Sequence, residues 1–335
     1  MMKIAINGFG RIGRNFLRAI LEDSTIADKI NVAAINIGPA EIKNIAHLFE
    51  YDTLMGKYPG HVSMQDNCLI VDDHKIPIYS IVEPKDLPWK KLGIDWVVDS
   101  SGRFRTRDKA SMHIQAGAKK VLVSAPMEGE DITIIPGVND NLYDSLNHDL
   151  VSLGSCTSNA LIPLVKVLHE DFQIKRGFMT TIHAYTNDQV LLDVEKSDLR
   201  RARAAALNII PTSTGATKVL KKVLPDIADK IQGLAIRVPV AKVSLIDLVV
   251  ELVKEPTAAE VNQSFKKASE QDFLGILDIT YKQLVSTDFS GNSYSVVVDG
   301  LLTQVESNLT KVIAWYDNEW AYSVRMKNFL EKMVA

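Results

Sequence analysis

The sequence opens on the stretch KIAINGFGRIGRNFLRAIL, residues 3–21. A short β-rich run is followed directly by the Gly-x-Gly-x-x-Gly pattern of Gly8, Gly10 and Gly13. Residues 11–21 then carry apolar side chains at the spacing of an amphipathic helix. A lone pattern of this kind can be an ordinary flexible turn. Between a strand and a helix, however, it predicts a dinucleotide-binding unit.

Each glycine of the pattern has an expected role in such a unit. Gly8 permits the tight turn, Gly10 lets a pyrophosphate approach the backbone, and Gly13 allows close packing of helix and strand. The N-terminus of the helix offers unpaired N–H groups and a partial positive charge to the phosphates. One feature is missing, because Ile37 stands where an acidic residue should accept hydrogen bonds from the ribose. Asn36 and main-chain groups could hold the ribose instead.

Strand and helix patterns continue to alternate through the first half of the chain. Further buried strands are expected at NVAAIN, WVVDS and VLVSA, and helices over residues 41–50 and 106–115, the second closing at Gly117. This alternation predicts βαβ units and a doubly wound parallel sheet of the Rossmann type. The first domain is expected to span residues 1–154.

The alternation of short strands and helices ends after residue 151. A helix over residues 157–169 is followed by the long β-rich runs FMTTIHAY, GLAIRVPV and VSLIDLVVEL, which predict an α+β catalytic domain over residues 155–317. Pro163 should kink this helix or delay its start, since proline cannot supply a backbone N–H. The amphipathic segment 318–335 predicts a final helix that packs back on the first domain.

Composition restricts the class of function. The chain has 335 residues, 46% hydrophobic side chains and a net charge of −3, which favour a two-domain globular protein and no nucleic-acid or membrane partner. The sequence has only two cysteines, Cys68 and Cys156, which are too few for a disulfide framework or a multi-cysteine metal site. None of the seven histidines lies at metal-ligand spacing from a cysteine or a carboxylate, so no metal site is expected. A cytoplasmic protein is expected, because no signal peptide or bilayer-spanning apolar run is visible.

Cys156 lies in SCTSN, at the transition from a strand into a helix. A thiol at a helix N-terminus has its thiolate stabilised by unpaired N–H groups, which favours a nucleophile. The alternative is a buried structural cysteine, a common role for this residue. Cys68, beside Leu69 and Ile70, fits that alternative better.

His183 lies in the β-rich run FMTTIHAYTNDQ and could be the base that a nucleophilic cysteine requires. It could equally be a core histidine with satisfied hydrogen bonds. Five further residues could bind phosphate through hydroxyl, backbone N–H or guanidinium groups, namely Thr186, Arg201, Thr214, Gly215 and Arg237. Arg237 is the most suggestive, because a cation within the apolar strand AIRVPV requires an anionic partner. Arg200, Arg201 and Arg203 could instead form a solvated face or an intersubunit ion-pair cluster.

Taken in order, GFGRIG, SSGRF, SAP, SCTSN, HAYTNDQ, DLRRARAAA, NIIPTSTGA, AIRVP and WYDNEWAYS resemble the glyceraldehyde-3-phosphate dehydrogenase family across nearly the whole chain. The resemblance implies the phosphorylating oxidation of glyceraldehyde 3-phosphate through a cysteine thioester, a step of glycolysis and gluconeogenesis. It implies a nicotinamide dinucleotide cofactor, inorganic phosphate as second substrate, and a homotetramer.

The resemblance also assigns roles to single residues. It implies that Cys156 is the nucleophile and His183 its base. It implies phosphate or substrate contacts from Ser155, Thr157, Thr186, Arg201, Thr214, Gly215 and Arg237. Dinucleotide contacts are implied for Gly8, Gly10, Arg11, Ile12, Gly13, Ser124 and Asn318, the last near the nicotinamide carboxamide.

Three departures from the family pattern occur, at Ile37, Val82 and Ala160. The first two leave the choice between NAD and NADP open, whereas Ala160 only replaces a second cysteine that takes no part in attack. Two alternatives accompany the main interpretation. One is the sister family of erythrose-4-phosphate dehydrogenases, which differs in the segments equivalent to YTNDQ and PTSTGA. The other is a non-catalytic dinucleotide-binding scaffold.

Overall fold

A computed structural model describes residues 1–334, which form two units. The first unit consists of Met1–Ile134, Asn141–Gly154 and the C-terminal stretch that begins at Ser323. The second consists of Ile135–Asp140 and Ser155–Tyr322. The chain therefore crosses between the units near residues 134, 141, 155 and 322. The predicted first domain, residues 1–154, wrongly included residues 135–140, which belong to the second unit.

A nine-stranded sheet forms the centre of the first unit, in the order β10-β11-β9-β8-β1-β2-β7-β6-β5. The predicted strands are confirmed as β1 (Met2–Asn7), β2 (Ile30–Asn36), β8 (Trp96–Asp99) and β9 (Lys120–Val123), all parallel to their neighbours. The remaining strands are β5 (Val62–Gln65), β6 (Cys68–Val71), β7 (His74–Tyr79), β10 (Ile132–Thr133) and β11 (Leu150–Ser152), with the small pair β3 (Tyr51–Asp52) and β4 (Gly56–Lys57) outside the sheet.

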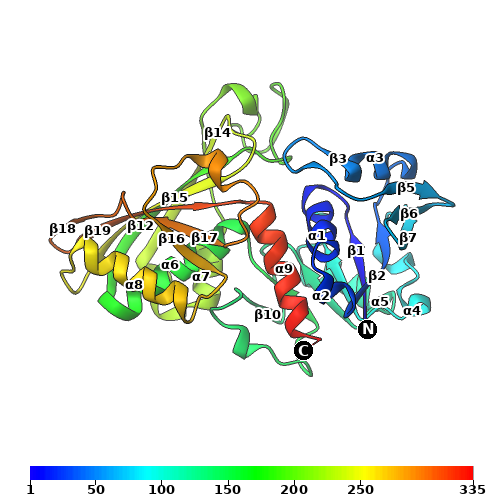
Figure 1. Cartoon of the computed structure of the whole chain (residues 1–335), viewed down its shortest axis with the longest axis horizontal. Helices are drawn as coiled ribbons and strands as arrows, with labels where there is room; N and C mark the ends of the chain where they lie inside the picture. Colours follow the sequence, from blue (N-terminus) through cyan, green and yellow to red (C-terminus); the bar gives the residue numbers. More distant parts are fainter. Residues whose placement is uncertain (335) are drawn as a thin grey trace. The chain divides into compact units, whose positions relative to one another are not determined.

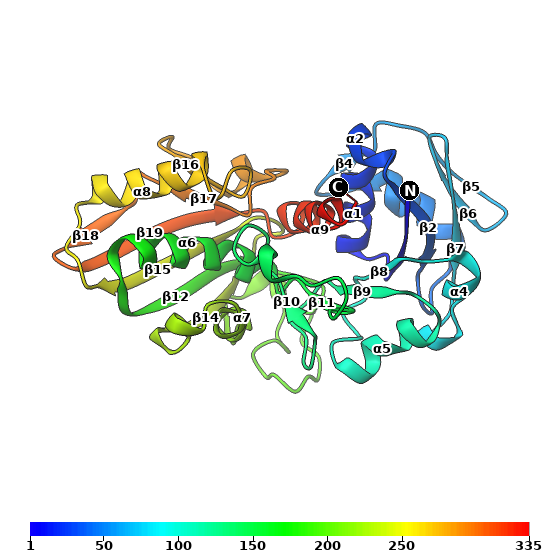
Figure 2. The same cartoon turned by 90° about the horizontal axis from the view of Figure 1, so that it is seen from below.

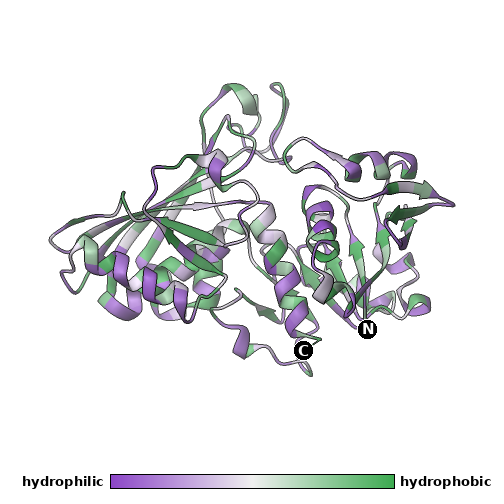
Figure 3. Ribbon diagram, in the orientation of Figure 1, coloured by the Kyte–Doolittle hydropathy of each residue, from purple (hydrophilic) through white to green (hydrophobic). Residues whose placement is uncertain are grey.

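Helices cover both faces of this sheet, with α1 (Arg11–Leu21) and α5 (Arg107–Gln115) on opposite sides (Figure 2). The central strands β1 and β2 are largely apolar, whereas the covering helices turn polar residues outward (Figure 3). The shorter helices are α2 (Ser24–Ala27), α3 (Ile45–Glu50) and α4 (Trp89–Leu92). Gly117 follows the end of α5 with φ 99°, as expected beyond a helix C-cap. The doubly wound fold predicted for the first half is confirmed.

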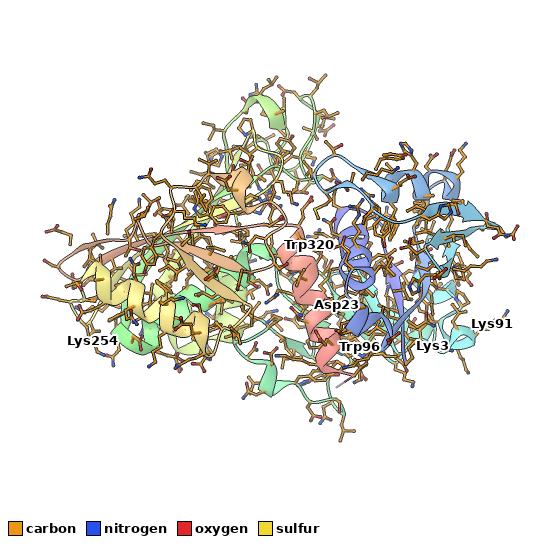
Figure 4. The ribbon with its side chains drawn as sticks, in the orientation of Figure 1. Lys3, Asp23, Lys91, Trp96, Lys254 and Trp320 are labelled. Carbon is orange, nitrogen blue, oxygen red and sulfur yellow. The ribbon has the colours of Figure 1, made fainter. Side chains whose placement is uncertain are left out.

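The final helix α9 (Trp320–Lys332) belongs to the first unit from Ser323 onward. Lys327 forms an ion pair with Asp23 at the start of α2, and the ring of Phe329 lies 5.6 Å from that of Trp96. Asp23 and Trp96 are labelled beside this helix in Figure 4. These contacts fix the second half of α9 on the α1 side of the sheet.

An eight-stranded sheet forms the second unit. It contains β12 (Ile174–Ala184), β13 (Ile210–Thr212), β14 (Ile231–Val238), β15 (Ser244–Leu252), β16 (Leu277–Thr280), β17 (Val296–Asp299), β18 (Gln304–Glu306) and β19 (Leu309–Tyr316). Helices α6 (Cys156–Phe172), α7 (Ala216–Val223) and α8 (Ala258–Glu270) lie together on one face (Figure 1). Their apolar side chains and those of the inward sheet face form one buried core.

The prediction for Pro163 was partly wrong. Helix α6 begins at Cys156, seven residues ahead of Pro163, and the proline lies inside the helix. The start is stabilised by a capping box, in which the Ser155 hydroxyl accepts from the Ser158 backbone N–H and the Ser158 hydroxyl accepts from that of Ser155. Within residues 1–334, no helix is long and apolar enough to cross a membrane.

Candidate active site

The glycine-rich turn between β1 and α1 leaves no room for side chains at two of its three glycines. Gly8 has φ 93°, and a Cβ there would lie 2.4 Å from the backbone nitrogen of Ser101. A Cβ on Gly13 would lie 2.3 Å from the carbonyl oxygen of Gly8. At Gly10 a Cβ would meet no atom within 4 Å, so the turn is open there. This combination fits a backbone that a pyrophosphate approaches at Gly10.

The start of α1 has the electrostatic character of an anion site. Gly10 is its N-cap, no side chain caps it, and its first turn contains no acidic residue. The first N–H groups of a helix have no partner within the helix. The guanidinium of Arg11 forms an ion pair with Asp52, so this side chain is already occupied by a carboxylate. A dinucleotide therefore fits the main chain of α1 better than the side chain of Arg11.

Four strands bring their carboxyl ends to the same edge of the first sheet, where β1 and β8 mark the reversal of strand order. Asn7 is the last residue of β1, and its side-chain nitrogen donates to Asp99 at the end of β8 over 2.6 Å. Ser124 follows β9, and its backbone nitrogen donates to the Asp99 carbonyl over 2.9 Å. The predicted cofactor residues Gly8, Gly10 and Ser124 thus lie in loops, and Gly13 in the first turn of α1, at the edge where such folds bind nucleotides.

The alternative in which Asn36 and main-chain groups hold the ribose is affected at the Asn36 side chain. The side chain of Asn36 is buried, donates to Asn7 Oδ1 over 2.7 Å and to the Ile81 carbonyl over 3.0 Å, and accepts from the Ile81 backbone nitrogen over 3.0 Å. It is therefore committed to the protein. Ile37 follows it, with its backbone nitrogen bound to the Tyr79 carbonyl over 2.9 Å.

Cys156 and His183 meet in the second unit. Cys156 is the first residue of α6, His183 lies one residue before the end of β12, and Sγ is 3.5 Å from Nε2. The other ring nitrogen, Nδ1, lies 2.6 Å from the carbonyl oxygen of Ala184. Nδ1 also lies 2.9 Å from Nη1 of Arg237, so this nitrogen faces both a hydrogen-bond acceptor and a donor. Nε2 is the ring nitrogen that faces the sulfur, at the position where a base for the thiol acts.

Burial and nearby charge shift the pKa of both members of this pair. Burial, and next the nearby charge of Arg237, lower the pKa of His183 to about 3. Burial raises the pKa of the Cys156 thiol, although Arg237, Thr157 and the N–H groups at the start of α6 oppose it. The helix N-terminus therefore acts on the thiol in the predicted direction, and burial acts against it.

Arg237 lies directly beside His183, since the two residues are partners in the pairing of β12 with β14. Its Nη1 donates to the Ala184 carbonyl over 2.9 Å and lies 3.5 Å from the Thr186 hydroxyl. Its Nε is buried without a hydrogen-bond partner within residues 1–334. No carboxylate of this described chain forms an ion pair with Arg237. The anionic partner expected from the sequence is thus not supplied by the protein.

Arg201 is placed differently. Its Nε donates to the Thr212 hydroxyl over 2.9 Å, and it forms ion pairs with Asp188 and Asp198. Arg203 pairs with Asp193 over 2.6 Å. Arg201 and Arg203 therefore have carboxylate partners within the described chain, and an ion-pair cluster between subunits stays a prediction.

The remaining phosphate candidates lie at helix starts. Gly215 is the N-cap of α7, and the Thr214 hydroxyl accepts from the Ala216 backbone nitrogen over 3.2 Å. The Thr157 hydroxyl lies 3.0 Å from that of Tyr316 in the interior. Since the Ser155 hydroxyl caps α6, Ser155 and Thr157 use their hydroxyls within the protein.

Two functional candidates were missed from the sequence. Ser244 donates its hydroxyl proton to Asn318 Oδ1 over 3.2 Å, and Tyr316 OH lies between Thr157 and Thr181. In VSLIDLVVEL every second side chain is buried, which puts Ser244 on the same inward face as Ile246. A serine at an inward position among aliphatic residues was therefore the sequence feature that could have identified Ser244.

Comparison with known proteins shows the family. Models of the glyceraldehyde 3-phosphate dehydrogenase NAD binding domain and C-terminal domain match residues 2–107 and 155–318. Glyceraldehyde-3-phosphate dehydrogenase 2 of Bacillus subtilis is 49% identical over 335 residues, covering 100% of this chain and 97% of that protein. The chain belongs to the glyceraldehyde-3-phosphate dehydrogenase family.

Other members are equally similar. Glyceraldehyde-3-phosphate dehydrogenase 1 of Bacillus cereus is 49% identical over 100% of this chain and 99% of its own length. The Geobacillus stearothermophilus protein is 48% identical over 97% of this chain and 96% of its own. The family assignment makes this protein an oxidoreductase with a Rossmann-type domain for a nicotinamide dinucleotide, and it does not favour the erythrose-4-phosphate alternative.

Proposed function

We propose that this protein catalyses the phosphorylating oxidation of D-glyceraldehyde 3-phosphate to 1,3-bisphosphoglycerate. The observation that carries the proposal is the approach of Cys156 Sγ to His183 Nε2 at 3.5 Å, with Arg237 beside them and without an acidic partner. A nucleophile, a base and an unpaired cation together suit an aldehyde that bears a phosphate.

The residues act in sequence on the substrate. Nε2 of His183 takes the thiol proton as the sulfur adds to the aldehyde carbon, and it returns that proton to the new alkoxide to give a hemithioacetal. It then removes the hydroxyl proton during oxidation to the thioester, where a general base contributes roughly 10² to 10⁴ in rate. The nicotinamide cofactor, when bound, supplies the hydride acceptor. Inorganic phosphate finally displaces Cys156 from the acyl carbon.

Two sets of groups suit the two phosphates. Arg237 and Thr186 are assigned to the substrate phosphate, because their side chains meet at 3.5 Å beside the catalytic pair. Thr214 and Gly215, at the N-terminus of the eight-residue helix α7, are assigned to inorganic phosphate together with Ser155 and Thr157. Arg201, whose Nη2 donates to the Ser213 carbonyl over 3.2 Å, supports that second set.

We assign cofactor binding to residues 1–154, chemistry to residues 155–317, and contacts with the dinucleotide to Gly8, Gly10, Arg11, Ile12, Gly13, Ser124 and Asn318. The cofactor proposal includes NADP as well as NAD. Ile37 neither accepts from a ribose hydroxyl nor repels a 2′-phosphate, and the neighbouring Asn36 side chain is committed elsewhere. A cytoplasmic homotetramer is part of the proposal. The two free cysteines suit a reducing compartment.

The test is a comparison of Cys156→Ala and His183→Asn with the parent. With glyceraldehyde 3-phosphate, cofactor and phosphate, Cys156→Ala should lose acylation while its unfolding temperature stays close to that of the parent. His183→Asn should acylate slowly and show slower alkylation of Cys156 by iodoacetamide. Replacing glyceraldehyde 3-phosphate by erythrose 4-phosphate in the same assay tests for erythrose-4-phosphate dehydrogenase activity. A parent without dehydrogenase activity, or full activity in Cys156→Ala, would favour a scaffold instead.

A further inference from the structure

Asn318 has one half of its side-chain amide held by the protein. Its Oδ1 accepts a hydrogen bond from the Ser244 hydroxyl over 3.2 Å. Its Nδ2 has no hydrogen-bond partner within the described residues 1–334, yet it is not sealed from solvent. The amide is therefore fixed at its oxygen and open at its nitrogen.

Ser244 determines which way this amide points. The buried Ser244 oxygen already accepts from the Ala184 backbone nitrogen over 3.1 Å, so its own proton must find an acceptor. Asn318 Oδ1 is that acceptor. If the amide were turned around, two donors would point at the serine oxygen and its proton would be left without a partner, which is costly in a buried position. The hydroxyl thus selects the orientation with Nδ2 outward.

The same serine is connected to the catalytic histidine. Ala184 donates its backbone N–H to Ser244, and its carbonyl oxygen lies 2.6 Å from His183 Nδ1. Ala184 therefore contacts both the serine that orients Asn318 and the ring of the base.

We propose that Ser244 is a positioning residue that presents the NH₂ group of Asn318 to the carboxamide oxygen of the nicotinamide while it holds the backbone N–H of Ala184, the residue that follows His183. This inference rests on the proposed function, in which Asn318 binds the nicotinamide. An amide that could rotate would offer its donor only part of the time, so the nicotinamide half of the cofactor would be bound less tightly.

The experiment compares binding of NAD and of ADP-ribose, which lacks the nicotinamide, by calorimetry with the full chain. In Ser244→Ala the NAD affinity should fall about tenfold, the loss of roughly one hydrogen bond to the ligand, with ADP-ribose affinity within about twofold of the parent. In an Asn318→Ala background, Ser244→Ala should have no further effect on NAD, since the serine acts through the asparagine. Ser244→Thr, which keeps the hydroxyl, should restore the preference for NAD.

Several outcomes overturn the proposal. These are an unchanged NAD affinity in Ser244→Ala, equal losses for NAD and ADP-ribose, the same loss with and without Asn318, or a parent that binds the two ligands equally. If Ser244→Ala does not fold, Ser244→Cys, whose thiol is a weak donor, replaces it with the same expectations. A parent that binds NAD more tightly than ADP-ribose but has no dehydrogenase activity would refute the proposed function alone.

Discussion

Arg237 is the residue whose surroundings most clearly call for a ligand. Its Nε is buried without a partner, and no ion pair with the described chain neutralises it. Arg237→Leu should therefore raise KM for glyceraldehyde 3-phosphate by roughly tenfold or more, since charge-assisted hydrogen bonds contribute about 1.5–3 kcal/mol each. The KM of Arg237→Lys should lie between those of the parent and of Arg237→Leu, because lysine keeps the positive charge but lacks the planar set of N–H donors of a guanidinium. Unphosphorylated glyceraldehyde is the control. If its KM rises equally, Arg237 acts in the structure rather than on the phosphate.

Ile37 is the residue on which cofactor choice is expected to depend. A carboxylate there would accept from the ribose hydroxyls and repel a 2′-phosphate. Ile37→Asp should increase the affinity for NAD roughly tenfold, because one charged hydrogen bond to the ribose is gained. It should decrease the affinity for NADP roughly tenfold, because the carboxylate repels the 2′-phosphate. The measurement is the ratio of kcat/KM for the two cofactors in parent and variant. A parent that already rejects NADP more than a thousandfold, with no change in the variant, would show that Ile37 does not determine the choice.

The sequence identified Cys156 and His183 as candidates but not the groups that surround them. A helix start is visible in SCTSN, and its effect on a thiol is general. The groups beside His183 include Arg237 of β14 and the ring of Tyr316 of β19, which come together with it only in the folded unit. Ser244 was invisible as a functional residue for the same reason, because its two partners lie sixty residues before it and seventy-four after it.

At the scale of elements, periodicity predicted what is locally determined. Helix α1 spans residues 11–21 as predicted, because the glycine positions and the apolar spacing both lie within one segment. The predicted helix 41–50 is instead split into a 3₁₀ turn over Ile42–Asn44 and the short helix Ile45–Glu50. The edge strand β5 and its neighbour β6 were not predicted. They pair as an antiparallel hairpin whose residues are only partly buried, where alternation gives a weak signal.

The start of α9 is held by a buried ion pair. Lys242 Nζ lies 3.0 Å from Asp317 Oδ2, and their side chains are 5% and 0% exposed. Asp317 also accepts from the backbone nitrogens of Gly291, Glu319 and Trp320, so it fixes both a loop and the first turn of the helix. Trp320, at the start of α9, is labelled in Figure 4.

Removing the lysine would leave this carboxylate buried without its counter-charge. Lys242→Met should therefore destabilise the protein by about 3–5 kcal/mol in urea unfolding at neutral pH. Lys266→Met is the matched control, because the Lys266–Glu270 pair has a similar 3.0 Å separation but side chains 47% and 61% exposed. It should cost less than about 1 kcal/mol. Equal effects of the two substitutions would mean that burial of the Lys242 pair has no energetic consequence.

At the scale of the whole molecule, the change from alternating strands and helices to long β-rich runs correctly separated two kinds of sheet. It could not show that residues 135–140 belong with the second unit, or that α9 is divided between units at Tyr322. Those assignments depend on packing. Gly137, for example, lies so close to Ile276 that a Cβ would be 2.3 Å from its side chain.

The proposed homotetramer comes from the family resemblance, and the outer face of the second sheet suits it. Met179 points into the core with α6, so its neighbour Phe178 points to the opposite face, where it is 68% exposed. Leu234, paired with Thr180 on the same face, is 44% exposed. Exposed apolar side chains gathered on one sheet face are typical of an interface between subunits.

A charge at the centre of this face should therefore break the assembly. Phe178→Asp would place a carboxylate in a desolvated interface, at a cost of several kcal/mol for each copy of the contact. We expect the parent to sediment as a tetramer at micromolar concentration and the variant as a smaller species with its secondary structure intact. Leu146→Asp is the control, because Leu146 is 88% exposed and belongs to the first unit, which does not contain this sheet. It should leave the sedimentation coefficient unchanged. A monomeric parent, or a tetrameric Phe178→Asp variant, would show that this face is not where the subunits meet.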